Sequence, residues 1–148
     1  MTLAQTIRIL EGVAAAQPSV NMIVRNDIFR LNACTAARYG VFGWTQGQHS
    51  ATVDGSLMRF RFTLVYIDRL TADQGNQVEV QSAGIATLDN IIRTLAEMGA
   101  VADEGYTFQT FNQRFLDECA GVFASVTFAV PVGGTCPDEF DPMEILTI

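Results

Sequence analysis

Lysine is absent from this chain of 148 residues, and histidine occurs only once, at His49. The nine basic side chains are therefore all arginines, and with sixteen acidic side chains they give a formal net charge of −7. A nucleic-acid-binding domain needs a surplus of positive charge on some face to neutralise phosphates. The composition argues against such a domain, although it permits a protein past which DNA slides without being held.

Arginine without lysine has two interpretations. Arginine forms planar, bidentate pairs and is favoured at protein–protein interfaces, where lysine is depleted. A compositional bias of the source genome would give the same pattern. The charges are also placed unevenly: residues 1–93 hold eight arginines and seven acids, whereas residues 94–148 hold one arginine and nine acids. The end of the chain is therefore strongly acidic.

Cysteine is scarce, and Cys34, Cys119 and Cys136 contain no C-x-x-C pair. With a single histidine they offer no zinc site of suitable spacing. Their odd number, without a secretory signal at the start of the chain, predicts reduced thiols. No apolar run approaches the roughly 20 residues that a bilayer span requires. We therefore expect a soluble protein made in the cytoplasm, with no membrane span, metal or cofactor.

The commonest parts of an active site are also missing. Gly133-Gly134 precedes no helical pattern, so it does not have the context of a phosphate-binding loop, and no G-x-S-x-G motif occurs. The carboxylates are scattered and suggest no particular acid pair. Cys34 and His49 could form a nucleophile–base pair, but a lone cysteine is more often a buried apolar residue. We therefore expect a protein that is not an enzyme.

The N-terminal segment has the pattern of a helix. Thr2 and Gln5 have the spacing of a capping box, and apolar side chains then recur on one face. Gln17-Pro18 is expected to end this helix, because proline cannot continue it. Residues 20–24 then alternate as in a strand, whereas residues 28–31 either continue that strand or form a helical turn.

Four further segments alternate as strands do: residues 38–46, 57–69, 106–110 and 122–130. In residues 57–69 one face is plainly apolar and consists of Phe60, Phe62, Leu64 and Tyr66. The other face begins with Arg59 and Arg61 and ends with Val65 and Ile67. We expect this second face to be covered over only half its length.

A second helix is predicted to start at Asn76, with Glu79 as the reciprocal capping partner, or near Gly84, and to stop at Gly99. Its expected core-facing residues are Ile85, Leu88, Ile91, Ile92, Leu95 and Met98.

These elements predict an α+β fold with a mostly antiparallel sheet of four to six strands and two main helices packed on one face. We expect residues 1–131 to form the single domain and residues 132–148 to form an extended acidic tail with an apolar end. A solvated tail has little use for apolar side chains, so we expect the tail to dock on this subunit or on a neighbouring one.

Three features are candidates for surface function. Arg59 and Arg61 either lie in water or meet carboxylates of another subunit. The charged loop after the strand of residues 57–69 is either a locally paired capped loop or a ligand-binding site. The acidic tail is the third. The candidate subunit-interface residues are Arg59, Arg61, Asp68, Arg69, Asp73, Phe140, Ile145 and Leu146.

One run carries a resemblance to a known family. A Phe-Arg-Phe-Thr-Leu-Val-Tyr-Ile-Asp-Arg-Leu strand from Phe60 leads through a loop with Asp and Asn to Glu79-Val80-Gln81-Ser82 and a helix striped with Ile and Leu up to Leu95. This run resembles small virion proteins of tailed bacteriophages, of the tail-terminator, tail-completion or head–tail connector kind, in particular phage and prophage proteins of gut bacteria. The chain length and the order of elements are also similar to that group.

The resemblance implies a non-catalytic structural protein that forms a homo-oligomeric ring at the tail end or at the head–tail junction. Its partners would be further copies of itself and other tail, portal or connector proteins, and DNA would pass without specific binding. It would be located in the virion and assembled in the cytoplasm of the host bacterium. The rival interpretations are a small cytoplasmic ligand-binding module and an enzyme that uses Cys34 or His49.

Overall fold

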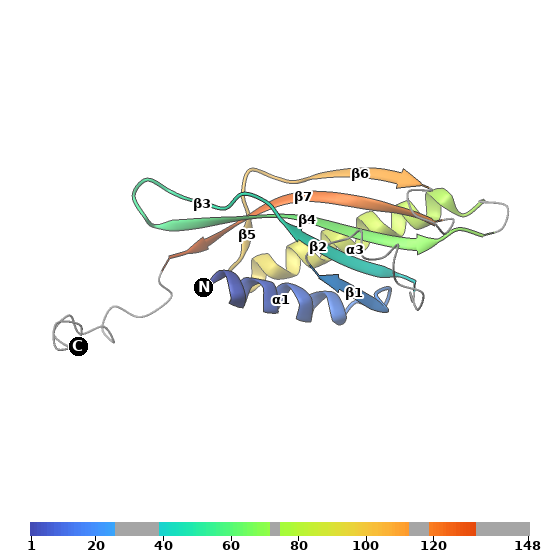
Figure 1. Ribbon diagram of the computed structural model, residues 1–148, viewed down its shortest axis with the longest axis horizontal. Helices are drawn as coiled ribbons and strands as arrows, with labels where there is room; N and C mark the ends of the chain where they lie inside the picture. Colours follow the sequence, from blue (N-terminus) through green and yellow to red (C-terminus); the bar gives the residue numbers. More distant parts are fainter. Residues whose placement is uncertain (26–38, 72–74, 113–118, 133–148) are drawn as a thin grey trace.

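The computed structural model describes residues 1–25, 39–71, 75–112 and 119–132. Within these ranges the chain forms two helices and a seven-stranded sheet (Figure 1). In chain order the elements are α1 (Leu3–Ala15), β1 (Met22–Arg25), β2 (Val41–Gln46), β3 (Ser50–Ala51), β4 (Leu57–Arg69), α3 (Gln77–Glu97), β5 (Val101–Ala102), β6 (Thr107–Asn112) and β7 (Cys119–Pro131).

Helix α1 begins with the predicted capping box. The Thr2 hydroxyl accepts a hydrogen bond from the Gln5 N–H at 3.1 Å, and the Gln5 side-chain oxygen accepts one from the Thr2 N–H at 2.8 Å. Both bonds satisfy backbone donors that the first turn of a helix leaves without partners. The helix ends at Ala15, two residues before Gln17-Pro18, as the proline requires.

Helix α3 takes the longer of the two predicted extents and has Asn76 at its N-cap as predicted, but the predicted reciprocal capping bonds are not formed. Asn76 precedes the helix without a side-chain cap bond. Its side-chain oxygen instead accepts from the Thr71 N–H at 2.8 Å, and its amide donates to the Arg69 carbonyl at 3.3 Å. Asn76 therefore ties the start of α3 to the end of β4 rather than closing a reciprocal cap with Glu79.

The predicted buried stripe of α3 is confirmed in the middle of the helix but not at its two ends. The stripe holds for Leu88, Ile91, Ile92 and Leu95, but Ile85 and Met98 are exposed. Gly84 faces the sheet in place of Ile85, at a point where a Cβ atom would lie 2.9 Å from Val122 Cγ2 and 3.0 Å from Tyr66 Cδ1. The glycine permits a close approach of helix and sheet that a larger side chain would prevent.

The sheet has the order β1-β2-β4-β7-β5, with β3 paired to β4 and β6 paired to β7. Strands β1 and β2 pair in parallel, and every other pair is antiparallel. The α+β prediction with a mostly antiparallel sheet is therefore confirmed. The sheet has seven strands rather than four to six because β3 and β5 are two residues long, too short to show an alternating pattern.

One face of the sheet carries the main core and both helices. The even-numbered side chains of β4 from Phe60 to Tyr66 are buried there together with residues of α1 and α3, such as Leu10 and Leu88. Figure 1 shows α1 below the two long strands β4 and β7 and α3 crossing them obliquely. No helix in the described part of the chain is long and apolar enough to cross a membrane.

The opposite face divides into two halves. Val65 and Ile67 belong to a second buried cluster with Val41 and Cys119, which contains no residue of α1 or α3. Towards the start of β4, Arg61 is exposed on the same face. The prediction that this face of β4 is covered over only half its length is confirmed.

Candidate subunit interface

The half of the second sheet face that no other described element covers is here called the open face. It combines side chains of six strands that the register brings together, since alternate residues of paired strands point to the same side. None of its members belongs to the buried clusters. They are Thr45 of β2, Ser50 of β3, Leu57, Arg59, Arg61 and Thr63 of β4, Val101 of β5, Thr107 of β6, and Ser125, Thr127, Ala129 and Pro131 of β7.

Short hydroxyl side chains fill the middle of the open face. Thr63 of β4 lies opposite both Thr45 of β2 and Ser125 of β7, and Ser125 lies opposite Thr107 of β6. One row of four small polar residues thus crosses four strands. Because these four side chains are short, the row presents hydroxyl groups and no charge.

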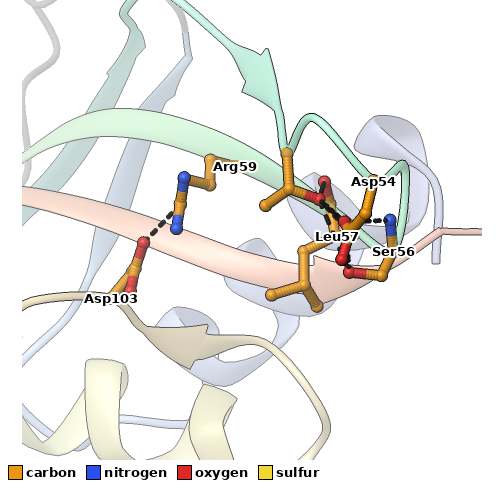
Figure 2. Close-up of polar contacts among 6 residues, drawn as sticks. Asp54, Ser56, Leu57, Arg59 and Asp103 are labelled. Atoms are coloured by element: carbon orange, nitrogen blue, oxygen red, sulfur yellow. Dashed lines mark hydrogen bonds and ion pairs between the residues drawn. The ribbon is translucent and has the colours of Figure 1, made fainter.

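Arg59 has its partner within the same subunit. Its Nε donates to Asp103, which follows β5, at 2.5 Å (Figure 2). The Asp103 backbone N–H bonds the Thr127 carbonyl at 2.7 Å, which fixes this carboxylate beside β7. Both side chains are partly exposed, and such pairs contribute about 0–1 kcal/mol. Arg59 is therefore neutralised locally.

Arg61 has a different environment. Its side chain is exposed and passes over Gly47, where a Cβ atom would lie 3.0 Å from Arg61 Cγ. Its backbone N–H donates to His49 Nδ1 at 3.2 Å, but no carboxylate of the described residues pairs with its guanidinium. The open face therefore presents one positive charge that the described part of its own subunit does not neutralise.

His49 has both ring nitrogens engaged. Nδ1 accepts from the Arg61 N–H, so the proton lies on Nε2, which donates to the Gln46 side-chain oxygen at 2.9 Å. The ring also stands edge-on to Phe60 at 5.4 Å between centroids. These contacts assign His49 to holding β2 and the following turn against β4. Its suggested partner Cys34 lies outside the described residues.

The turn from Thr52 to Ser56 forms a well-bonded tip. Asp54 Oδ1 accepts from the Thr52 hydroxyl at 2.7 Å, and from the Ser56 hydroxyl and N–H at 2.8 and 3.0 Å (Figure 2). The Ser56 N–H bond, followed by the two hydroxyl bonds, lowers the pKa of Asp54 to about 2. Val53 stands fully exposed at this tip, a large apolar side chain that sequence alternation does not single out.

The charged residues at the end of β4 do not converge on a common ligand-binding site within the described residues. Asp68 accepts from its neighbour's N–H, that of Arg69, at 2.8 Å and from the Tyr66 hydroxyl at 3.4 Å. Burial, followed by the charge of Asp68, raises the pKa of Tyr66 to about 12. Arg69 points to the opposite side of β4, with its guanidinium 5.1 Å from the centroid of the Tyr39 ring. Asp68 and Arg69 therefore make local contacts on the two opposite faces at the end of β4.

The remaining predicted interface residues, Asp73, Phe140, Ile145 and Leu146, lie outside the described residues. The structure adds apolar residues that the sequence analysis missed, namely the exposed Val101 beside Ala129 and Val132 after β7. Val101 has no sequence signal because its strand has two residues. Among the described residues no group of three or more His, Cys, Asp or Glu side chains could hold a metal ion.

No model of a known protein family matches the chain. A search of curated proteins also finds no match.

Proposed function

We propose that this chain is a structural protein of a tailed-bacteriophage virion that acts as a homo-oligomeric ring at the tail end or head–tail junction. The observation that supports the proposal best is the open face. It is a sheet surface without a covering helix among the described residues, and it carries Arg61 without a carboxylate partner there.

The composition of the open face suits contact with protein. Interfaces favour arginine and are depleted in lysine and in acidic side chains. The open face has two arginines, no carboxylate other than the Asp103 that Arg59 binds, and apolar positions such as Val101 and Ala129 at its end. Small hydroxyl groups can satisfy polar groups of a partner without leaving a buried charge.

The shape of the sheet suits a repeated, head-to-tail contact. Strands β4 and β7 pair along all thirteen residues, from Leu57 opposite Pro131 to Arg69 opposite Cys119. The open face lies at one end of these strands, away from the buried cluster at the other end. A contact between two different surfaces of identical subunits generates a ring when the rotation closes.

The charges are compatible with DNA passing through such a ring. The described residues hold six arginines and eight acids, so the folded body is close to neutral. A surface without a positive surplus does not bind phosphates strongly, and DNA can slide past it.

Negative-stain electron microscopy of the purified full chain tests this proposal. We expect annular particles of one diameter with an open centre. The matched comparison is Arg61→Glu, which removes the uncompensated positive charge of the open face and should reduce the fraction of annular particles. Fields without annular particles over a wide range of protein concentrations would contradict the proposal.

A further inference from the structure

The open face has the chemistry of a docking site for an acidic, apolar segment. At its end the apolar side chains of Leu57, Ala129, Val101 and Pro131 lie around the Arg59–Asp103 pair. One row further along the strands, Arg61 offers a guanidinium without a carboxylate partner among the described residues. A segment that fits must bring carboxylates for Arg61 and apolar side chains for the end of the sheet.

The chain itself contains one segment of this composition. Residues 133–148 carry four acids and no basic residue, so the charge is complementary to Arg61. The same segment has apolar side chains at Phe140, Met143, Ile145, Leu146 and Ile148. An arginine and a carboxylate form strong, bidentate hydrogen bonds, and these apolar side chains gain free energy when they leave water.

Residues 133–148 start beside the open face, and they are long enough to reach across the same face of an adjacent subunit. The segment follows Val132, whose N–H bonds the Ser56 carbonyl at 3.1 Å beside the open face. Sixteen residues in extended form span about 50 Å. The thirteen residues of β7 span about 43 Å, so the segment can cross the whole open face of an adjacent subunit.

We infer that residues 133–148 of one copy dock on the open face of a neighbouring copy, with their carboxylates at Arg61 and their apolar side chains at the end of β4, β5 and β7. This inference rests on the proposed ring, because it makes the neighbour the recipient. Each subunit then gives its tail to one neighbour and receives a tail from the other, which links the subunits around the ring.

Charge reversal tests the electrostatic part with the full chain. Arg61→Glu should weaken assembly at least tenfold in 0.1 M salt, measured as the concentration at which half the protein is assembled. Arg8→Glu is the matched control, since Arg8 is also exposed without an ion pair in the described residues but lies on α1. We expect Arg8→Glu to leave assembly unchanged.

A charge-swap experiment distinguishes docking of the tail at residue 61 from a general effect of net charge on assembly. Replacing the four tail acids with arginine should weaken assembly alone and restore it at least partly when combined with Arg61→Glu. Failure of the double variant to recover would overturn the inference. Unchanged assembly of Arg61→Glu would also overturn it but would leave the proposed ring standing, whereas a wild-type chain that never assembles would overturn the ring itself.

Mixed cross-linking decides which copy receives the tail. One chain carries Thr127→Cys and the other Leu146→Cys, both in a background with Cys34 and Cys136 changed to serine. Oxidation of the mixture should join the two chains in a covalent heterodimer. A chain that carries both cysteines and closes only an internal disulfide would show the tail on its own subunit and overturn the inference.

Discussion

Single side chains explain why the tip of the β3–β4 turn keeps its shape. One carboxylate oxygen of Asp54 serves three donors from Thr52 and Ser56, and these bonds favour the charged form of Asp54. The turn thereby holds Val53 in full contact with solvent. An apolar side chain fixed in this way loses little conformational freedom when a partner covers it.

The pKa of Asp54 predicts an acid dependence of the tip. The folded chain lowers the pKa from 3.8 to about 2, so the carboxylate stabilises the turn above pH 4 and this contribution is lost as the pH falls from 4 to 2. Asp54→Asn lacks this titration. Amide hydrogen exchange at Val53 and Gly55 should therefore be faster in the variant at pH 5, and the two proteins should become alike below pH 2. Equal exchange rates in the wild type and in Asp54→Asn at pH 5 would show that the Asp54 carboxylate does not stabilise the turn.

Tyr66 predicts the opposite pH dependence. Its folded pKa of about 12 lies above the ordinary value of 10, so the neutral phenol stabilises the fold below pH 10 and this stability is lost as the pH rises from 10 to 12. Tyr66→Phe should lose less of its free energy of unfolding than the wild type over this interval, as measured by denaturant titration. A parallel loss in both proteins would show that Tyr66 ionises as freely in the fold as in the unfolded chain.

At the scale of elements, the strength of a repeating pattern decides what could be predicted. Strand β4 was predicted at residues 57–69 because its apolar and polar side chains alternate over its whole length, and the structure confirms both ends. Strands β3 and β5 form only because β4 and β7 extend past their neighbours and offer free edges. No local pattern encodes a pairing of two residues.

The same reasoning explains the errors at α3 and at the interface. Periodicity indicates the apolar side of the helix. The residues that actually contact the sheet depend on Gly84, which lets the helix approach Tyr66 and Val122.

The partner of Arg59 was also not predictable from a local pattern. Arg59 and Asp103 are 44 residues apart and meet only because β5 pairs with the end of β7. The sequence therefore predicted Arg59 as a surface residue without its partner.

Close packing of the central strands makes Gly121 a sensitive position. A Cβ atom there would lie 2.1 Å from the Tyr66 carbonyl oxygen and 2.7 Å from Phe111 Cζ. Gly121→Ala should therefore lower the free energy of unfolding by about 1–3 kcal/mol, in denaturant titration at a fixed protein concentration.

Gly12→Ala is the matched control for this substitution. Gly12 is exposed within α1, and a Cβ atom there meets nothing within 4 Å. Because alanine favours helix more than glycine, Gly12→Ala should raise the free energy of unfolding by about 0.5–1 kcal/mol. The account of the central packing would be wrong if both alanines had the same effect.

At the scale of the whole molecule, charge is divided between a nearly neutral body and acidic segments. The described residues have two more acids than arginines, whereas the complete chain has seven more acids than arginines. Residues 133–148 alone contribute four acids. An exposed Arg61 on the folded body and a negatively charged C-terminal segment are complementary in charge, and on this basis we propose that the segment of one copy docks on the next.

Removal of the tail should therefore affect assembly and leave the fold intact. A chain that stops after Val132 keeps every described strand and helix, so its circular dichroism spectrum and thermal midpoint at low concentration should match those of the full chain. Its assembly should weaken at least tenfold. A shortened chain that unfolds would show that the tail completes the core of its own subunit.

The central claim is that identical copies of this chain join into a closed ring. Native mass spectrometry of the full chain tests it most directly, because it counts the subunits of each complex. We predict one dominant complex with a fixed number of subunits, which persists as the protein is diluted to the low micromolar range. A spectrum that contains only single chains, or an unbroken series of every subunit number, would contradict it.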